Sequence, residues 1–452
     1  MVGRSAENAF LQGSVRKLTL RLALPCLLAM LFSGLSTLFD ALFIARLNPS
    51  LAAAAGFCFP IVTLIQAIGF TLGMGAGSYV SRELGKGAMS GRAVSAASTA
   101  FFLALMLGGL LCLLGQLFPQ TLLRLLGAKE NALSSTIPYA RFVLFCAPLT
   151  CTSLVLASLL RAQGKPMPIL AAYSLGAAAV TGLSFLLIGR CAMGVFGAGI
   201  AMLTREALVL AVFFFYIFRE KDCLRPSLRA VSLRLETFQD IMRSGIPTLV
   251  RQGLMSISGI MLSRMLAQFG ESAVAGMGLA LRMVNLITSA IIGFGQGFSP
   301  VCAANYGADR MDRVQDAYRF CMRACLSVLP LLGAAVYVAA PFLLDSFAPD
   351  ETIAAFARLA LRAQCVFFFA QGAIILMNML TQSMGFPVRA ILVACGRQGY
   401  ILIPILLTLP RLLGAWGLIL AQPVSDALSL GVSWLLTRSI WKEQDKKDQA
   451  RS

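Results

Sequence analysis

Residues 22–46 read LALPCLLAMLFSGLSTLFDALFIAR, an apolar run whose only charged residues are Asp40 and the closing Arg46. A helix needs about 20 mostly apolar residues to cross the hydrocarbon core of a bilayer, and this run is long enough. Eleven comparable runs follow, at 51–80, 93–117, 139–160, 168–190, 197–218, 243–268, 274–304, 320–344, 359–384, 388–410 and 414–437. We therefore predict an all-α membrane protein with twelve transmembrane helices.

The composition agrees with this fold class. Of the 452 residues, 58% are hydrophobic and 13% are charged, whereas soluble domains have about 25% charged residues. The net charge of +18 does not indicate a nucleic-acid partner, because the Lys and Arg residues lie between spanning-length apolar runs. They concentrate on the side of both termini and of the central connection, which places these segments in the cytoplasm by the positive-inside rule.

Histidine is absent and the twelve cysteines form no Cys-x-x-Cys pair. Imidazole-based catalysis is therefore excluded, and most cysteines lie in apolar runs where they act as small buried hydrophobes. We expect no metal site and no cofactor. Residues 1–20 are expected to form a cytoplasmic amphipathic lead-in, and the hydrophilic tail at 441–452 to be disordered.

The chain repeats itself. An offset of 222 residues aligns eight pairs: Pro25/Pro247, Leu27/Leu249, Ser36/Ser258, Ala53/Ala275, Gly56/Gly278, Gly73/Gly295, Gly75/Gly297 and Gly85/Gly307. We predict an N-terminal six-helix lobe at 1–218, a cytoplasmic linker at 219–240 and a C-terminal six-helix lobe at 241–452. Because each unit has an even number of spans, the two bundles enter the membrane in the same direction, an architecture typical of transporters.

Asp40 is the leading candidate for chemistry. A carboxylate inside a membrane span is costly unless it is paired, hydrated or protonated. Burial disfavours the charged form of a carboxyl group, so an acid at this depth is suited to binding and releasing protons. The alternative is a helix-end acid that reaches the interface or pairs with Arg46.

Two further intramembrane acids, Glu206 and Asp426, are related by an offset of 220 residues. Arg397 lies at a depth comparable to that of Asp426, which indicates an ion pair between neighbouring helices. We expect Arg205 to pair poorly with Glu206, because adjacent helical residues point about 100° apart. A structural role and a coupling role stay open for these charges.

Other polar residues within the spans are candidates for lining a substrate cavity, although such groups often only bridge helices. The candidates are Gln66, Tyr139, Arg282, Asn285, Asn378 and Gln382. The Gly-rich stretches at 70–87 and 294–310 do not indicate a phosphate-binding loop, because no strand precedes them and neither contains Gly-Lys-Ser/Thr.

Taken in order, a set of short motifs resembles the multidrug and toxin extrusion (MATE) family, specifically its bacterial branch of drug exporters. The motifs are LALP, FDALFIARL, ELGKG, RAQGKP, GVFGAGIA, SGIPTLVRQ, GFGQGFSPVCAANYGA, SMGFP, GRQGYILIP and GAWGLILAQPVSD. The resemblance implies a V-shaped antiporter in the bacterial cytoplasmic (inner) membrane. It also implies export of small amphipathic or cationic compounds, by alternating access, in exchange for H⁺ or Na⁺.

Within this resemblance, Asp40 matches the first-helix acid and so implies the cation-coupling role. The family often has a second acid in the fifth helix, where this chain has Thr181 and Ser184; with Thr204 they are the candidate neighbours of the cation. Sodium prefers several oxygen ligands whereas a proton needs one carboxylate, so we favour protons. The second half has Leu262 where the first has Asp40, which places the coupling chemistry mainly in the first half.

Two other classes of function stay open. Arg282 and Arg397 are compatible with a flippase or an exporter of a lipid-linked or anionic metabolite. A membrane enzyme or a non-transporting scaffold is the remaining class, but the sequence offers no cluster of catalytic groups. We expect a monomer whose partners are a small-molecule substrate and the lipid bilayer.

Overall fold

The computed structural model describes residues 10–451 apart from 48, 88–90, 126–129, 221, 233 and 346–349. This part of the chain is almost entirely helical. The first half contains α2 (Val15–Leu47), α3 (Pro49–Gly85), α4 (Gly91–Leu117), α5 (Pro119–Leu125), α6 (Glu130–Ala162), α7 (Met167–Ser184), the π-helical turn η1 (Phe185–Arg190) and α8 (Gly194–Arg219).

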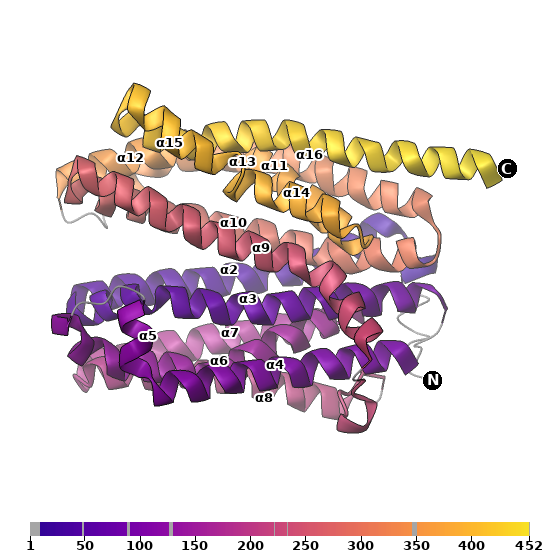
Figure 1. The fold of residues 1–452 in the computed structure, drawn as a ribbon, viewed down its shortest axis with the longest axis horizontal. Helices are drawn as coiled ribbons and strands as arrows, with labels where there is room; N and C mark the ends of the chain where they lie inside the picture. The colour runs from indigo at the N-terminus through magenta and orange to yellow at the C-terminus, as the bar shows by residue number, and fades with distance from the viewer. Residues whose placement is uncertain are drawn as a thin grey trace.

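The second half follows the short 3₁₀ turn η2 (Leu228–Ala230) and repeats this pattern. Its elements are α9 (Leu235–Leu266), η3 (Ala267–Phe269), α10 (Glu271–Gly307), α11 (Met311–Asp345), α12 (Glu351–Cys365), α13 (Phe368–Ser383), α14 (Pro387–Gln398), α15 (Leu402–Leu413) and α16 (Ala415–Arg451). The two halves form two bundles that lie side by side (Figure 1).

Ten helical segments among the described residues are long and apolar enough to cross a membrane. The pair α12 and α13 passes the same test together, with a bend of 54° between its members. The first membrane-length helix of the second half, α9, completes the predicted twelve, although Arg243, Arg251 and Arg264 make it less apolar than the others. The predicted fold class of two six-helix bundles is confirmed.

The structure differs from the prediction at several ends and breaks. The first span begins at Val15, seven residues before the predicted start, and the span predicted at 359–384 is bent at 366–367. The hydrophilic tail continues α16 as a helix to Arg451, so the expectation of disorder is wrong. This tail contains no Gly or Pro, and an ion pair between Arg389 and Glu443 holds its first turn against the bundle.

Both described termini lie at one end of the molecule, here called the termini end (Figure 1). Helices α3 and α10, which are repeat-related, meet there across the boundary between the lobes. A Cβ atom on Gly85 would lie 1.9 Å from the carbonyl oxygen of Ala304, and one on Gly307 would lie 2.1 Å from that of Arg82. Because both partners are related by the 222-residue offset, these are two copies of one contact around a pseudo-twofold axis.

The Arg82 side chain adds a polar tether to this contact. Its Nη1 atom donates hydrogen bonds to the Ser244 hydroxyl at 3.2 Å and to the Ser383 carbonyl oxygen at 2.9 Å. Arg82 belongs to α3 of the first lobe, whereas Ser244 and Ser383 belong to α9 and α13 of the second. The tether therefore closes the lobe boundary at the termini end.

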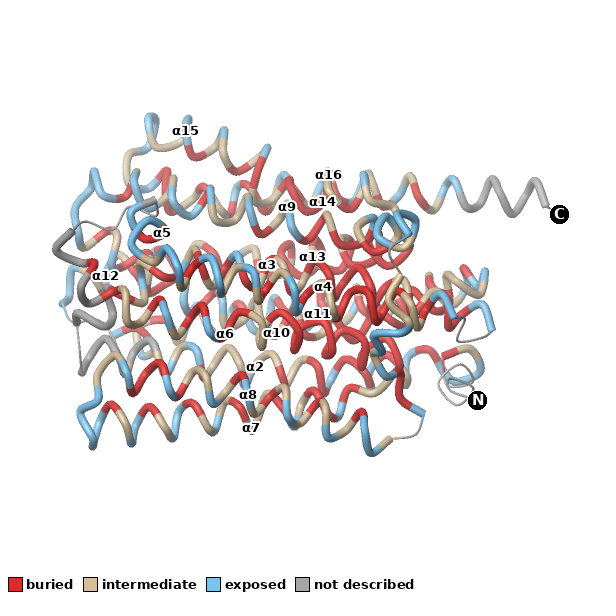
Figure 2. Tube along the Cα trace, turned by 60° about the horizontal axis from the view of Figure 1, so that its bottom comes forward, coloured by how far each residue is buried: buried red, intermediate tan, exposed pale blue. Residues whose placement is uncertain are grey.

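Burial also differs between the termini end and the opposite end of the molecule. Buried residues concentrate toward the termini end, and the opposite end is more exposed (Figure 2). In α10, all residues from Gly295 to Asn305 are buried, whereas the half of the helix nearer Glu271 has alternating buried and exposed positions. The described conformation is thus closed between the lobes at the termini end.

Cys191 provides a test of membrane orientation, because it is exposed in the connection between η1 and α8, away from the termini end. If the termini are cytoplasmic, a membrane-impermeant maleimide should label Cys191 from outside intact cells, and Cys191→Ser should abolish labelling. Cys223, in the linker, is buried, and burial raises the pKa of its thiol. Its thiolate population at pH 7 is therefore low, and Cys223 should react slowly even in opened vesicles. Labelling of Cys191 only from the cytoplasmic side would contradict the orientation.

A second prediction concerns the glycine contact. Gly85→Ala and Gly307→Ala each place a methyl group on a backbone oxygen of the other lobe, so the helices must separate. We expect each to cost about 1–3 kcal/mol in stability, as overpacking does, and to lower the thermal unfolding midpoint. Gly56→Ala is the matched control, because a Cβ atom there meets nothing within 4 Å. Equal midpoints for all three variants would show that the lobes do not need this approach.

Candidate functional site

Asp40 lies near the far end of α2 and is half-buried. Its carboxylate interacts with the Ser184 hydroxyl at the end of α7 and lies within electrostatic range of Arg205 on α8 and of Tyr139 on α6. No ion pair of Asp40 occurs within the described part of the chain; the side chain of Arg46, the alternative partner predicted from the sequence, lies outside that part. Four helices of the first lobe thus converge on this carboxyl group.

Glu206 is buried next to this cluster and is paired with Arg205. The Arg205 Nη2 and Nε atoms lie 2.6 Å and 3.0 Å from the Glu206 Oε1 atom. The expectation that these adjacent residues would pair poorly is therefore wrong. A long Arg side chain can curl around the helix, and a buried carboxylate without a partner would cost more than the rotamer this requires.

A cavity of about 10 Å³ adjoins the same arginine between α2, α7 and α8. It is lined by Ser33, Ser36, Tyr173, Gly176, Ala177, Arg205 and Val209. The Ser36 and Tyr173 hydroxyls are buried without a hydrogen-bond partner among the described residues. The volume is close to that of one water molecule, and the polar walls can hold one.

The other predicted neighbours of Asp40 differ from Ser184. Thr181 on α7 and Thr204 on α8 are exposed. Gln66 on α3 is half-buried, and Tyr139 packs with Phe43 and Ile188 besides facing Asp40. Of the predicted residues, Ser184 and Tyr139 are therefore the ones that the structure brings to Asp40.

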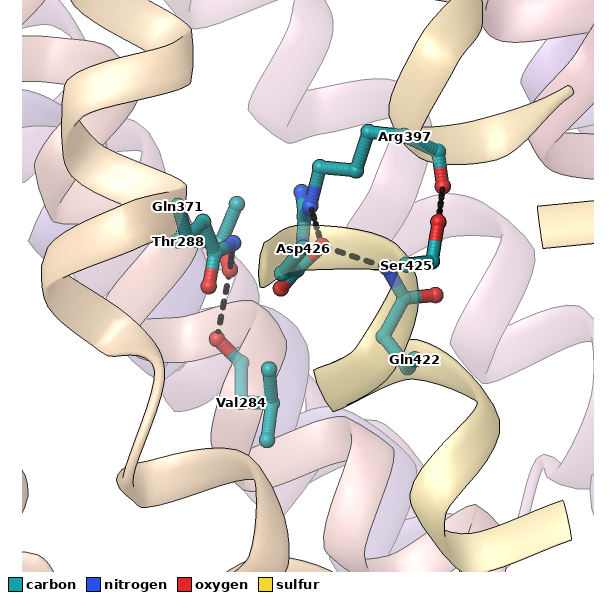
Figure 3. Close-up of polar contacts among 7 residues, drawn as sticks. All are labelled: Val284, Thr288, Gln371, Arg397, Gln422, Ser425 and Asp426. Carbon is teal, nitrogen blue, oxygen red and sulfur yellow. Dashed lines mark hydrogen bonds and ion pairs between the residues drawn. The ribbon is translucent and has the colours of Figure 1, made fainter. Parts of the chain in front are cut away.

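The second lobe contains a different polar cluster, centred on the predicted pair of Arg397 on α14 and Asp426 on α16 (Figure 3). The Arg397 Nε atom lies 2.7 Å from Asp426 Oδ1, and the Gln422 amide donates to the same oxygen at 2.8 Å. The Ser425 hydroxyl donates to the Arg397 backbone oxygen at 3.1 Å. The ion pair between neighbouring helices is confirmed.

Two more residues complete this cluster. When the Gln371 amide is oriented with its oxygen toward Arg397, it accepts hydrogen bonds from the two Nη atoms at 3.3 and 3.1 Å. Arg251 on α9 lies within electrostatic range of Arg397 and is partly exposed. Neither a hydrogen bond nor an ion pair involves the Arg251 guanidinium within the described chain. The second lobe therefore holds one more cation than carboxylates in this cluster.

Two predicted cavity-lining residues bridge helices instead. Gln382 is buried on α13, and its amide donates to the Ser244 backbone oxygen and to the Thr248 hydroxyl on α9. The Asn378 amide donates to the Ala390 backbone oxygen on α14 at 2.8 Å. Amides whose donors are used between helices stabilise the bundle, so these two residues have the bridging role that the sequence left open. Arg282 and Asn285 are exposed on α10, as a lining role requires.

The polar clusters around Asp40 in the first lobe and around Arg397 in the second lobe thus differ in the sign of their charge. The first combines Asp40 and Glu206 with Arg205, an excess of one negative charge when Asp40 is ionised. The second combines Arg251 and Arg397 with Asp426, an excess of one positive charge. The first lobe can therefore accept a proton or a cation, and the second an anionic group.

Arg82 and Arg251 were not among the candidates from the sequence. The available signal was a cation within a spanning-length helix, which marks a functional or tethering group. Arg82 lies within the Gly-rich stretch at 70–87, and Arg251 lies within the SGIPTLVRQ motif. Both stretches were interpreted from their glycines and prolines, and the arginines were not considered.

Two like-oriented six-helix lobes, with charged clusters in each, are the architecture of a membrane transporter. The chain belongs to the MatE family, whose sequence model matches residues 25–188 and 247–405. The matched segments begin at Pro25 and Pro247, the first repeat-related pair. This confirms the resemblance inferred from the motifs.

Relatives cover nearly the whole chain. The multidrug export protein MepA of Staphylococcus aureus (strain NCTC 8325 / PS 47) is 24% identical over 436 residues, covering 94% of this chain and 95% of that protein. MepA of Staphylococcus haemolyticus (strain JCSC1435) is 25% identical over 437 residues, with the same coverage. A structure described as the outward-facing conformation of a multidrug resistance MATE family transporter of the MOP superfamily is 25% identical. It superposes with a TM-score of 0.89 over 97% of this chain and 98% of that chain.

Proposed function

We propose that this protein is an antiporter that exports small amphipathic or cationic compounds in exchange for protons. The observation that carries the proposal is the position of Asp40, a half-buried carboxyl group without an ion pair in the described part of the chain. It lies close to a second acid, Glu206, which is already neutralised by Arg205. Protonation of Asp40 changes the net charge of this cluster from minus one to zero. The electrostatic interaction of the cluster with its surroundings therefore differs between the protonated and the deprotonated state.

Protons are favoured over sodium by the donor set. Sodium and other hard cations prefer several oxygen ligands, commonly with carboxylates among them. No group of three or more His, Cys, Asp or Glu residues is placed to hold a metal ion among the described residues. Around Asp40 the oxygen donors are Ser184 and Tyr139, both neutral, and one carboxyl group is sufficient for a proton.

The substrate class is supported by two points. The named relatives MepA are multidrug export proteins, and the first-lobe cluster has the negative charge that a lipophilic cation requires. The location that we propose is the bacterial cytoplasmic membrane, with both termini in the cytoplasm. One chain contains both lobes and both polar clusters, so we take the monomer as the transport unit, with no cofactor besides the coupling ion.

The test is export of a fluorescent cation from proteoliposomes with pH and sodium gradients imposed separately. Asp40→Asn should reduce export driven by the pH gradient to the rate of protein-free liposomes, because the amide cannot bind and release the proton. Asp222→Asn, which removes an exposed acid in the linker, should retain the wild-type rate. Full pH-driven export by Asp40→Asn would remove Asp40 from the coupling step, and export driven by sodium alone would replace the proton.

A second candidate function is the export of anionic compounds, and Arg251 is the observation that favours it. This guanidinium lies near Arg397, with no carboxylate of its own in the described chain. A carboxylate or phosphate group on a substrate would supply the missing partner through charge-assisted hydrogen bonds.

Arg251→Gln distinguishes the two candidates. If the substrate is anionic, this change should weaken binding of a carboxylate-bearing dye about tenfold, the value of one charge-assisted hydrogen bond. If the substrate is cationic, removal of a repelling charge should strengthen binding of a cationic dye. Arg264→Gln, at an exposed position of the same helix, is the control for loss of charge. Binding is measured by fluorescence anisotropy on purified protein.

A further inference from the structure

A second cavity lies outside both polar clusters, at the termini end. It has a volume of about 360 Å³ and is lined by Arg16, Asp316, Arg319, Phe320 and Arg323. This volume is within the range of sites that bind small ligands or ligand headgroups. Three arginines against one aspartate give the walls an excess of two positive charges.

The arginines come from both lobes. Arg16 is in the first turn of α2, and the other two are in the first four turns of α11. The segment just before α2 is held to the start of α11 by Arg313, which donates to the Gly13 backbone oxygen at 2.7 Å, and by Arg310, which donates to that of Leu11 at 2.8 Å. Arg310 and Arg313 thus fix this junction between the lobes. The three arginines that line the cavity are not used in these contacts.

The cavity arginines lack an ion pair within the ranges that the structure describes. All three are exposed, and none forms an ion pair within the described chain. Arg319 donates one hydrogen bond, at 3.0 Å, to the neutral Gln315 side chain. Asp316 also lies within electrostatic range of Arg313, so part of its charge acts outside the cavity. The walls therefore present unneutralised guanidinium groups to an anion.

The helix faces that carry the arginines continue into the membrane as apolar surface. On α2, Leu20 and Leu24 follow Arg16 at intervals of four residues, and they are 48% and 57% exposed. On α11, Leu326 follows Arg319 and Arg323 on the same face and is 46% exposed. Residues four apart on a helix lie one above the other, so on each helix the cavity arginines and the exposed leucines share one face.

We propose that this cavity binds the headgroup of an anionic phospholipid, with its phosphodiester on the arginines and an acyl chain along Leu20, Leu24 and Leu326. Guanidinium groups bind phosphate oxygens in a bidentate manner, and basic pockets between transmembrane helices on the cytoplasmic side suit such headgroups. The hydroxyls of a phosphatidylglycerol headgroup can donate to the Asp316 carboxylate. Because α2 and α11 belong to different lobes, the bound lipid contacts both sides of the lobe boundary.

The test measures lipid binding to the purified full-length protein in detergent by native mass spectrometry. Palmitoyl-oleoyl phosphatidylglycerol should bind at least about tenfold more tightly than the phosphatidylcholine with the same chains. The triple variant Arg16→Gln, Arg319→Gln and Arg323→Gln should lose this preference. The control variant Arg229→Gln and Arg234→Gln removes two exposed linker charges and should retain it.

Two further arms separate lipid binding from misfolding of the variant and from binding of free phosphate. The triple variant with lysine at the same three positions keeps the charge and should retain most of the preference, which checks that loss in the glutamine variant is not misfolding. Inorganic phosphate and glycerophosphoglycerol, which lack acyl chains, should not displace the lipid at millimolar concentration. Equal binding of both lipids, an unchanged glutamine variant, or displacement by free phosphate would overturn the proposal. The binding needs no gradient or substrate, so Asp40→Asn should leave it unchanged.

Discussion

The close approach of α3 and α10 at Gly85 and Gly307 is the constraint on which the arrangement of the lobes depends. At each site the missing Cβ atom allows one backbone to press on a carbonyl oxygen of the other lobe. The two contacts are copies of each other under the sequence repeat, so the pseudo-twofold axis passes between them. The short separation of α3 and α10 also allows the Arg82 side chain to cross the boundary between the lobes and reach Ser244 and Ser383.

The repeat explains why the lobes pack alike, and the departures from it explain why they differ chemically. Asp40 corresponds to Leu262 in the second half, and Arg251 corresponds to Ala29 in the first. Asp40 and Arg251 are thus charges of opposite sign that the repeat does not share between the first helices of the two lobes. By contrast, the repeat-related acids Glu206 and Asp426 are both neutralised by arginines, from α8 and α14 respectively. Glu206 and Asp426 are thus paired inside their lobes, whereas Asp40 and Arg251 have no ion pair among the described residues.

The number and order of the helices were largely predictable from the sequence, because apolar runs and the internal repeat mark them. Apolar length located most spans, and the repeat identified α9 despite its three arginines. Side-chain partners were less predictable. The Arg397–Asp426 pair followed from comparable depth, but the Arg205–Glu206 pair contradicted the spacing rule, because a long flexible side chain is not bound by the direction of its Cβ. Gln382 and Asn378 were assigned to a cavity because sequence gives the depth of a residue but not the helix it faces.

Helix α2 connects the charge at Asp40 with the lobe boundary. Near one end it carries Asp40 beside Ser184 and within range of Arg205, and toward the other it packs against α10, where Gly293 and Gly297 meet the backbone of residues 22–27. A bound ion can shift a conformational equilibrium only through contacts that differ between the two states. Under the proposed coupling, a proton on Asp40 alters the attraction between α2 and the Arg205 side of its own lobe. Since the same helix packs against α10 of the second lobe, a change in its position also changes the contact between the lobes.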